Sequence, residues 1–346
     1  MDIHAPMVSF CMTTYKRPAL LKKTLHQLRG QVFRDFEVVI SDNDPEASAG
    51  PVVRELQDPR FKYYHNEDNL GMIRSFNRSI ERSAGKFIVM ITDDDPVYPE
   101  MLQTLFDLYQ QYPDYGVYMG GYDTFFGSLL LAKVSKARVG INSALADSEI
   151  GTVKKYTSEE FLPAFCKDAF GAGMHWSAAM VRRDIALEVG GFPEYGTPHL
   201  ADCSYILLAG SRSGMVHINT SVCYRIIHGD NYSYVNANYD NIYNAPEGFY
   251  KWTMERLPVS LRTAGTEKAL KDFIGRHMSY YVIVVKKMIL NLHAGSEDFE
   301  RFVHKFYKIP YLRRWRLKYY IAIHFPNLFE VFLATKRLIF PAAGNK

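Results

Sequence analysis

Residues 87–95 read Phe-Ile-Val-Met-Ile-Thr-Asp-Asp-Asp, an apolar run that leads directly into three consecutive carboxylates. The apolar run predicts a buried strand, so the carboxylates lie where that strand ends, at one edge of a sheet. Three negative charges this close repel one another unless a cation lies among them. Mg²⁺ or Mn²⁺ suits the position, because it takes one or two carboxylates and shares its remaining positions with phosphate oxygens. A solvated turn or helix cap is the alternative, since aspartate is favoured at both.

Alternating strand and helix signals surround this stretch in the first 120 residues. The sequence predicts strands at 8–12, 36–41, 61–65 and 87–91, and helices from Pro18, at 69–84 and at 100–112. Repeated strand–helix units favour an α/β fold with a mostly parallel, Rossmann-like sheet flanked by helices on both faces. Ligands bind at the carboxyl ends of the strands in such sheets, and Thr14, Asp42 and the aspartates fall there.

The composition excludes several classes of protein. With 47% apolar residues the chain can bury a large core, and a formal net charge of only +4 gives no global basic field for nucleic acid. The sequence shows no basic, apolar leader at its start and no uncharged run near the ~20 residues of a membrane span, so we expect a cytoplasmic location. The cysteines lie far apart and predict buried thiols in a reducing compartment: Cys11, Cys166, Cys203 and Cys223.

An ordered series of motifs over roughly the first two thirds of the chain resembles glycosyltransferase family 2. The motifs are Val8-Ser-Phe-Cys-Met-Thr-Thr-Tyr-Lys-Arg-Pro18, Ile40-Ser-Asp-Asn43, Asn69-Leu-Gly71 with Asn77, Gly85 to Asp95, Gly190-Gly-Phe192, Asp202, and Tyr224 to Asn231. The resemblance implies an inverting enzyme of the GT-A fold. We therefore expect a catalytic domain over 1–238, with a nucleotide-binding half at about 1–120 and an acceptor half at about 121–238, followed by a helical extension over 239–346.

The resemblance assigns a nucleotide-sugar donor to groups near the ends of the first strands: Thr14, Tyr15, Arg17, Asp42, Asn69, Gly71, Arg74 and Asp93. Asp42 can accept a hydrogen bond from a uracil-like N–H, which favours a UDP-sugar. Simpler roles stay open for several of these residues. Asp42 also suits a turn, Asn69 suits a helix cap, and Arg74 suits a solvated helix face.

Within the aspartate triplet the family motif is DXD-like, and this chain has Thr92 where relatives often have aspartate, so the register of the motif stays open. The preferred alignment makes Asp93 a ribose or metal contact, Asp94 the principal ligand of Mg²⁺ or Mn²⁺, and Asp95 a supporting carboxylate. His228 would contact the metal or the diphosphate, or serve a structural role. The metal would stabilise the departing nucleoside diphosphate.

Inversion at the sugar carbon requires a general base that faces the acceptor hydroxyl. The resemblance places this base after the Gly-Gly-Phe turn, where Asp202 is the candidate and Ala201 replaces the usual acidic neighbour. Asp202 could instead begin a helix, in which case Glu194 and His199 are the remaining candidates.

The acceptor is expected to be a saccharide or a lipid-linked saccharide, in a bacterial surface-polysaccharide pathway. His175 and Trp176 are interpreted as lining the acceptor or sugar pocket, and a core position is the alternative for Trp176. From 301 to 346 ten Lys and Arg residues interleave with aromatics against Glu330 alone, which suits the surface of an anionic membrane. Helices packed on the catalytic domain with basic outer faces would give the same pattern.

Two other functions fit part of the sequence. A nucleotidyltransferase also needs carboxylates and a metal on an α/β sheet, but residues 13–18 lack the glycine-rich loop that it would place after the first strand. A non-catalytic nucleotide- or sugar-binding module of the same fold is the second alternative, because Ala201 weakens the match at the base. No GxGxxG follows the first strand, which disfavours a dehydrogenase.

Overall fold

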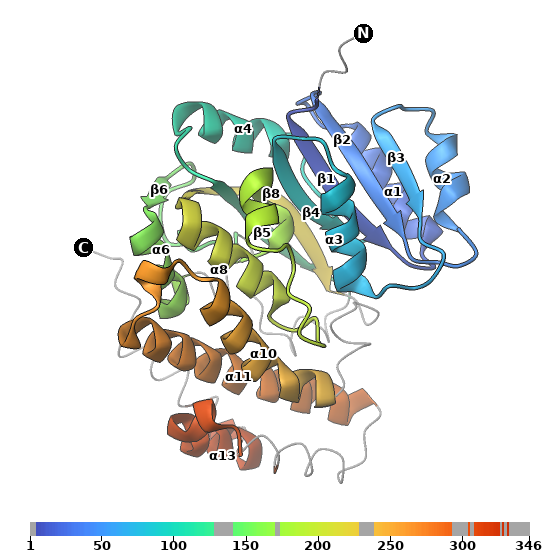
Figure 1. The fold of residues 1–346 in the computed structure, drawn as a ribbon. Helices are drawn as coiled ribbons and strands as arrows, with labels where there is room; N and C mark the ends of the chain where they lie inside the picture. Colours follow the sequence, from blue (N-terminus) through green and yellow to red (C-terminus); the bar gives the residue numbers. More distant parts are fainter. Residues whose placement is uncertain are drawn as a thin grey trace.

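The computed structural model describes residues 5–127, 141–169, 174–227 and 239–292, together with 304, 308–325, 327, 328 and 331. His228, for which a metal or diphosphate contact is expected, lies outside these residues. The described chain forms a twisted sheet with helices on both faces and a layer of helices from the C-terminal part packed below it (Figure 1). The predicted α/β class is confirmed.

The sheet has the strand order β3-β2-β1-β4-β7-β5-β8-β6 in the part of the chain that is described. The strands are β1 (Val8–Thr14), β2 (Phe36–Asp42), β3 (Phe61–His65), β4 (Phe87–Thr92), β5 (Val117–Phe126), β6 (Val153–Tyr156), β7 (Ala179–Arg182) and β8 (Met215–Ile227). β1 to β4 are parallel, as are β5 and β8. The short β7 runs antiparallel to both β4 and β5, and so joins the two halves of the sheet.

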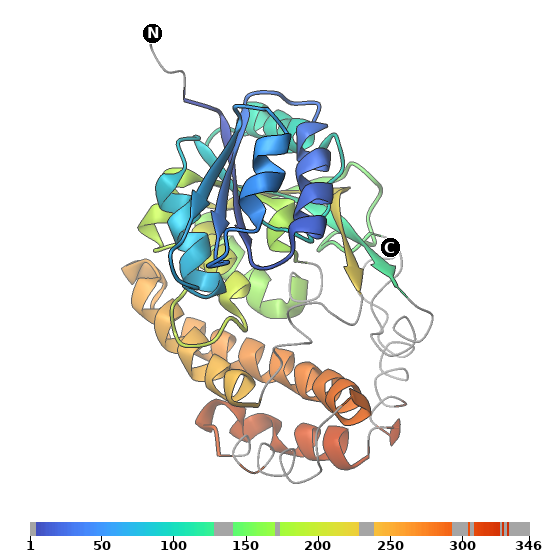
Figure 2. The ribbon, with the colours of Figure 1, turned by 90° about the vertical axis from the view of Figure 1, so that its right-hand side faces the viewer.

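Helices cover both faces of the sheet. On one face lie α1 (Pro18–Arg29), α2 (Ala49–Glu55) and α4 (Met101–Gln111), and on the other lie α3 (Met72–Arg82), α7 (Arg183–Glu188) and α8 (Ala201–Ser213). Figure 2 shows α3 on the opposite side of the sheet from α1 and α2. Because both faces are covered, β1 and β2 are buried along their whole length, which explains their nearly continuous apolar sequences.

The remaining elements are α6 (Ser158–Ala164), the π-helical turn η1 (Phe165–Ala169), the 3₁₀ turns η2 (Trp176–Ala178), η3 (Val259–Leu261) and η4 (Pro310–Trp315), and the helices α10 (Tyr239–Arg256), α11 (Ala264–Leu292) and α13 (Arg316–His324). α10 packs on α8, and α11 packs on α6, η1 and α13. Among the described helices, none has the length and apolar character that a membrane crossing needs. All four cysteines are buried and unbridged, as predicted.

The pairing register of the parallel strands places their carboxyl ends side by side. Thr14 of β1 lies opposite Asp42 of β2, and Thr13 lies opposite Thr92 of β4. In a parallel sheet the carboxyl ends of neighbouring strands share one edge, so the three loops that follow these strands meet there. The same edge receives residues 190–200, which lead into α8 (Figure 1).

The predicted helix at 69–84 is wrong at its start, because α3 begins only at Met72. Gly71 has a φ of 77°, a left-handed conformation that an α-helix cannot contain. Asn69 accepts a hydrogen bond from the Gly71 N–H at 2.9 Å, so its side chain closes a turn before the helix and does not cap α3. Farther along the chain, α6 gives way to the π-helical η1 after Pro163, which has no N–H to donate.

The Gly-Gly-Phe turn is held from α3. Asn77 Nδ2 donates to the Phe192 carbonyl at 2.9 Å, and the Phe192 N–H donates to Asn77 Oδ1 at 2.9 Å. Gly191 has a φ of 64°, and a Cβ added there would lie 2.4 Å from Asn77 Oδ1. This reciprocal amide pair therefore needs glycine at 191 and fixes the chain that leads toward Asp202.

We predict that Gly191→Ala lowers the free energy of unfolding by at least about 2 kcal/mol, because strain at positive φ adds to the clash with Asn77. Gly196→Ala is the matched control, since Gly196 also has a positive φ of 83° but an added Cβ would meet nothing within 4 Å. The control should lose only about 1 kcal/mol. Equal losses in urea denaturation would show that the Asn77 contact has no part in the effect.

Candidate active site

The first two aspartates after β4 share one cation. Arg17 Nη1 lies 2.9 Å from Asp94 Oδ2 and 3.5 Å from Asp93 Oδ1. Hydroxyl groups hold the other oxygen of each carboxylate, because Thr14 donates to Asp93 Oδ2 at 2.7 Å and Thr92 donates to Asp94 Oδ1 at 2.7 Å. The remaining oxygens, Asp93 Oδ1 and Asp94 Oδ2, thus both face the guanidinium of Arg17.

Arg17 neutralises only part of the negative charge of Asp93 and Asp94. Burial, followed by the negative charge of Asp94, raises the pKa of Asp93 to about 7 even though Thr14 and Arg17 act in the opposite direction. Asp93 is only 4% exposed, so water does little to relieve the repulsion. A further positive charge at this position would stabilise the ionised pair.

The third aspartate faces different partners. Asp95 Oδ2 accepts hydrogen bonds from Trp176 Nε1 and Ser177 Oγ, both at 2.8 Å, and from the Thr92 N–H at 3.0 Å. Burial alone would raise the pKa of Asp95, but the field of His175 and these hydrogen bonds outweigh it and lower the pKa. Asp95 is therefore held as a carboxylate that ties the end of β4 to η2 in the second half of the sheet.

His175 and Trp176 both lie beside the triplet. His175 Nε2 is 3.7 Å from Asp95 Oδ1, and its ring lies 5.2 Å from the Tyr122 ring. Trp176 packs between the rings of Phe76 and Phe192, at 5.8 and 5.5 Å, while its indole N–H faces Asp95. Trp176 thus belongs to the edge of the core, and His175 lies between Asp95 and Tyr122.

Asp42 ends β2 at the expected edge, and its carboxylate bonds within its own loop. Oδ1 accepts from the Asp44 N–H at 2.9 Å, and Oδ2 accepts from the Ala49 N–H at 3.2 Å and from the Tyr63 hydroxyl at 2.9 Å. These bonds agree with the alternative reading of Asp42 as a turn residue. Tyr15, by contrast, follows β1 with 43% of its surface exposed.

The turn before α3 joins the same edge. Asn43 Nδ2 donates to the Gly71 carbonyl at 3.2 Å, which fixes residues 69–71 beside the end of β2. Arg74 lies on the first turn of α3 and its Nε donates to Glu194 Oε2 at 2.8 Å. Arg74 and Glu194 are both exposed, so this ion pair is a surface contact. The Glu194 carboxylate is thus already paired with Arg74.

Asp202 lies in the first turn of α8, where its Oδ1 accepts from the Cys203 N–H at 2.8 Å. Leu200, with a φ of 65°, precedes the helix and turns the chain into it. Burial raises the pKa of Asp202, as a general base requires. His199 differs, because burial and the neighbouring His277 lower its pKa to about 4, which makes its ring a weak base.

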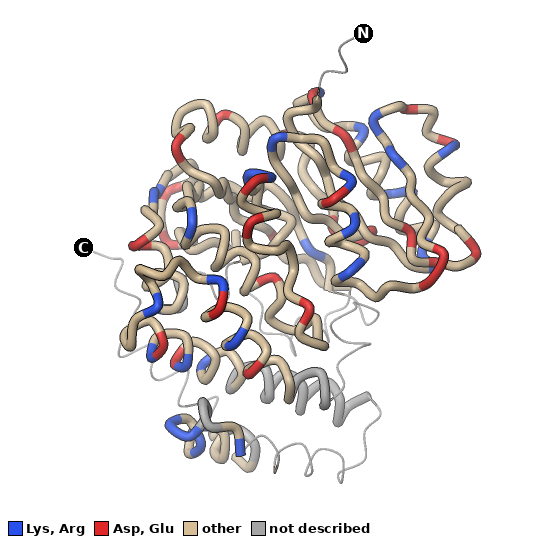
Figure 3. Tube along the Cα trace, viewed as in Figure 1, with Lys and Arg blue, Asp and Glu red and all other residues tan. Residues whose placement is uncertain are grey.

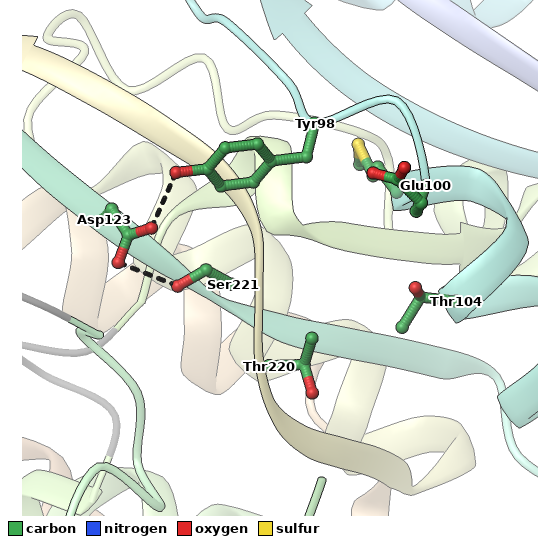
Figure 4. A pocket seen from close by; sticks show the side chains of 7 residues that line it. Tyr98, Glu100, Thr104, Asp123, Thr220 and Ser221 are labelled. Atoms are coloured by element: carbon green, nitrogen blue, oxygen red, sulfur yellow. Dashed lines mark hydrogen bonds between the residues drawn. The ribbon is translucent and has the colours of Figure 1, made fainter. Parts of the chain in front are cut away.

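A separate hollow of about 390 Å³ lies beside the start of α4, against β5 and β8. Figure 4 shows Tyr98 and Ser221 directed at Asp123, whose carboxylate accepts their hydroxyl hydrogens at 2.7 and 2.9 Å. Glu100 and Thr104 also line it, and the predicted site residues do not. The hollow is therefore distinct from the strand-end cluster.

Several residues that shape the site were not among the predicted ones. Thr92 and Ser177 orient the aspartates, and Asn77 holds the turn at Phe192. Arg225 of β8 bonds Thr124 Oγ1 at 3.1 Å, and its charge reaches His175. Asn77, Thr92 and Arg225 lie within motifs that carry the resemblance, but a single sequence does not show the contacts that they make.

The carboxylates fit a divalent cation that is shared with phosphates. Two convergent oxygens from neighbouring aspartates, one of them with a pKa raised to about 7, supply the hard donors and the unbalanced charge that Mg²⁺ or Mn²⁺ would satisfy. Within the described residues, no group of three or more His, Cys, Asp or Glu side chains gathers as an all-protein metal centre.

Comparisons with known proteins agree with this architecture. The profile of glycosyl transferase family 2 matches residues 9–190, and the chain belongs to this family. A Campylobacter jejuni GalNAc(5)-diNAcBac-PP-undecaprenol beta-1,3-glucosyltransferase is 29% identical over 131 residues, which cover 37% of this chain and 40% of that protein. A glucosyl-dolichyl phosphate glucuronosyltransferase of Haloferax volcanii is 23% identical over 194 residues, which cover 54% of this chain and 55% of that protein. The chain thus spans less than two thirds of these relatives.

Solved structures share the fold. S. aureus TarS 1-349 in complex with UDP-GlcNAc superposes with a TM-score of 0.63 at 15% identity, covering 86% of this chain and 79% of that one. The mannosyltransferase PcManGT from Pyrobaculum calidifontis, in complex with GDP-Man and Mn²⁺, superposes with a TM-score of 0.53 at 13% identity, covering 95% of this chain and 88% of that one. The GT-A fold that the sequence predicts is confirmed.

The charge imbalance at Asp93 predicts a pH-dependent cost in stability. A carboxyl whose pKa is raised on folding stabilises the fold below its unfolded pKa of about 3.9, and this contribution is lost as pH rises through the folded value of about 7. Asp93→Asn removes the buried charge. We therefore expect the variant to be more stable than wild type by about 1–3 kcal/mol at pH 8.5 and by a smaller amount at pH 5, where only part of the cost is present.

Urea denaturation at the two pH values measures this difference. Asp184→Asn is the control, because Asp184 is a surface carboxylate paired with Arg182. This control should not gain stability at pH 8.5. Loss of stability in Asp93→Asn at both pH values would contradict the claim that the buried negative charge of Asp93 destabilises the fold.

Proposed function

We propose that this protein transfers a sugar from a nucleotide-sugar donor, with UDP favoured, to an acceptor hydroxyl with inversion at the sugar carbon and with the aid of Mg²⁺ or Mn²⁺. The observation that carries the proposal is the convergence of Asp93 and Asp94 oxygens at the shared end of β1, β2 and β4. Membership of the family supports glycosyl transfer over nucleotidyl transfer.

The nucleotide would lie across the ends of β1 and β2. Tyr15 offers an exposed ring for the base, and Asn69 and Gly71 lie beside the end of β2 through the contact with Asn43. Asp42 would act through the 42–49 loop that it closes, since its oxygens already accept three hydrogen bonds. Residues 1–120 would then form the donor side and residues 121–238 the acceptor side.

The cation would be held by Asp94 with Asp93. When bound, it would neutralise charge on the diphosphate as the sugar leaves. Thr14 and Thr92 hold the outer oxygens of the two carboxylates, so the inner oxygens keep a fixed direction. Asp95 would support the metal position by anchoring the end of β4 to Trp176 and Ser177.

Asp202 would remove the proton from the acceptor. As the acceptor oxygen forms its bond to the anomeric carbon, the bond from that carbon to the phosphate oxygen breaks and its electron pair leaves on the nucleoside diphosphate. The acceptor proton passes to the Asp202 carboxylate, whose raised pKa strengthens it as a base. His175, beside Asp95 and with Arg225 near it, would line the sugar pocket.

The acceptor would be a saccharide carried on a lipid in surface-polysaccharide synthesis. This setting is supported by the names of relatives that act on undecaprenol- and dolichol-linked sugars. An acceptor of this kind lies at a membrane surface, which makes the C-terminal helices relevant to function.

Substitution Asp202→Asn tests the catalytic role. The amide cannot take up the proton, so we expect transfer to fall by about 10²–10⁴ while binding of UDP with Mn²⁺ is retained. Product formation with a panel of UDP- and GDP-sugars measures the first quantity, and the thermal shift produced by the nucleotide measures the second.

Asp184→Asn serves as the control for this substitution and should leave both quantities unchanged. If Glu194→Gln abolishes transfer while Asp202→Asn keeps it, Glu194 is the base. A wild-type protein that binds nucleotide and transfers no sugar to any acceptor would favour the non-catalytic binding module.

The C-terminal helices provide a surface that suits an anionic membrane. α13 packs inward through Tyr319, whose hydroxyl donates to the Gly275 carbonyl at 2.6 Å, and Trp315 covers the same glycine. Large apolar side chains then face outward: Leu317, Tyr320, Phe325, Leu328 and Val331. Lys and Arg gather on η4 and α13 beside them (Figure 3). An exposed mixture of basic and apolar groups is typical of helices that lie in a membrane interface.

We predict that the protein sediments with vesicles containing phosphatidylglycerol and binds phosphatidylcholine vesicles more weakly. Leu317→Glu places a negative charge on the outward face and should reduce binding about tenfold. Val259→Glu is the matched control, because Val259 is 80% exposed and belongs to η3 and not to η4 or α13. Equal losses in both variants would place the membrane contact elsewhere.

A further inference from the structure

Arg17 occupies the position between the carboxylates at which a cation would bind. Its Nη1 faces Asp93 Oδ1 and Asp94 Oδ2, the same two oxygens that the hydroxyls of Thr14 and Thr92 leave open. A divalent cation that used both oxygens would have to take the place of this guanidinium nitrogen. Arginine and metal are therefore alternatives at one point, and cannot both be held there.

The chain around Arg17 allows its side chain to leave. Arg17 follows Lys16, which has a φ of 55° in the left-handed region that non-glycine residues rarely adopt, and Pro18 starts α1 immediately afterwards. The turn thus stores backbone strain next to the residue that would move. The Arg17 side chain is 29% exposed, so it lies at the edge of the site and not within the core.

A diphosphate would give Arg17 a new partner. Guanidinium groups bind phosphate oxygens through charge-assisted hydrogen bonds, and a nucleotide at the ends of β1 and β2 would bring its phosphates beside the loop at 15–17. Loss of the aspartate contacts would then be offset by phosphate contacts. Metal alone offers no such compensation.

We infer that Arg17 is an internal counter-ion that competes with the divalent cation and yields to it only when a nucleotide diphosphate arrives. Arg17 so couples metal binding to donor binding, which makes the two ligands bind cooperatively. The inference rests on the proposed metal-dependent function. Arg17 thereby acts in opposite directions, since it weakens binding of the bare cation and strengthens binding of the nucleotide.

The test is a titration with Mn²⁺ in the absence of nucleotide. The concentration of free Mn²⁺ is measured at each step by electron paramagnetic resonance. Arg17→Gln should bind Mn²⁺ at least about tenfold more tightly than wild type, because a unit positive charge a few ångströms from the site is removed. In the presence of UDP, the same variant should bind the nucleotide with Mn²⁺ about tenfold more weakly. Arg17→Lys, which keeps the charge, should lie closer to wild type in both measurements.

Lys22→Gln is the matched control. Lys22 lies on α1 and pairs with Glu55 at the surface, so this variant loses the same charge without touching the aspartates. It should bind Mn²⁺ and UDP as wild type does. Adding Asp94→Asn to Arg17→Gln should abolish the gain in Mn²⁺ affinity if the ion binds at the triplet.

Each outcome decides between the claims. Unchanged or weaker Mn²⁺ binding in Arg17→Gln, with the melting temperature preserved, overturns the counter-ion role while the proposed function stands if wild type binds Mn²⁺ with UDP. A gain that survives Asp94→Asn also overturns it. Wild type that binds no Mn²⁺ with either UDP or GDP removes metal dependence itself, and the inference with it.

Discussion

Repulsion between carboxylates at the end of β4 is the constraint around which the first half of the molecule is arranged. Asp93 is buried against Asp94, and the cost appears as a pKa of about 7 for Asp93. The surrounding residues limit this cost, with a hydroxyl from β1, a hydroxyl from β4 itself and the guanidinium of Arg17 each contributing one partner. Buried carboxylates with a raised pKa are typical of functional sites, which supports the proposal that a cation binds here together with its ligand.

The third aspartate joins the two halves of the sheet. Asp95 receives hydrogen bonds from Trp176 and Ser177 of η2, which leads directly into β7. β7 in turn pairs with β4 and β5 in antiparallel fashion. The two halves of the sheet are thus connected through the short η2–β7 segment, which also contacts the aspartate cluster. The turn held by Asn77 gives a second connection, from α3 to the loop before α8.

Prediction from sequence succeeded where apolar periodicity dominates and failed where single backbone angles decide. The buried strands β1, β2 and β4 follow from apolar runs that only a sheet covered on both faces can accommodate. The start of α3 does not follow from the apolar pattern. The pattern begins earlier, but Gly71 with its positive φ delays the helix to Met72. At the site, the types and positions of the aspartates were predictable, but their partners were not. Asp42 bonds its own loop, and Glu194 pairs with Arg74 across 120 residues of sequence.

The sequence by itself determined the class of fold, the family, and the edge of the sheet at which acidic and polar residues collect. These depend on local pattern and on the order of motifs, both of which are properties of the chain before it folds. Only the tertiary structure decided that the three aspartates have different partners and that Arg17 lies between two of them. It also decided that the outer face of α13 is apolar as well as basic. Such facts depend on contacts between residues far apart in the chain, where a side chain has one direction among several and the packing of its neighbours selects it.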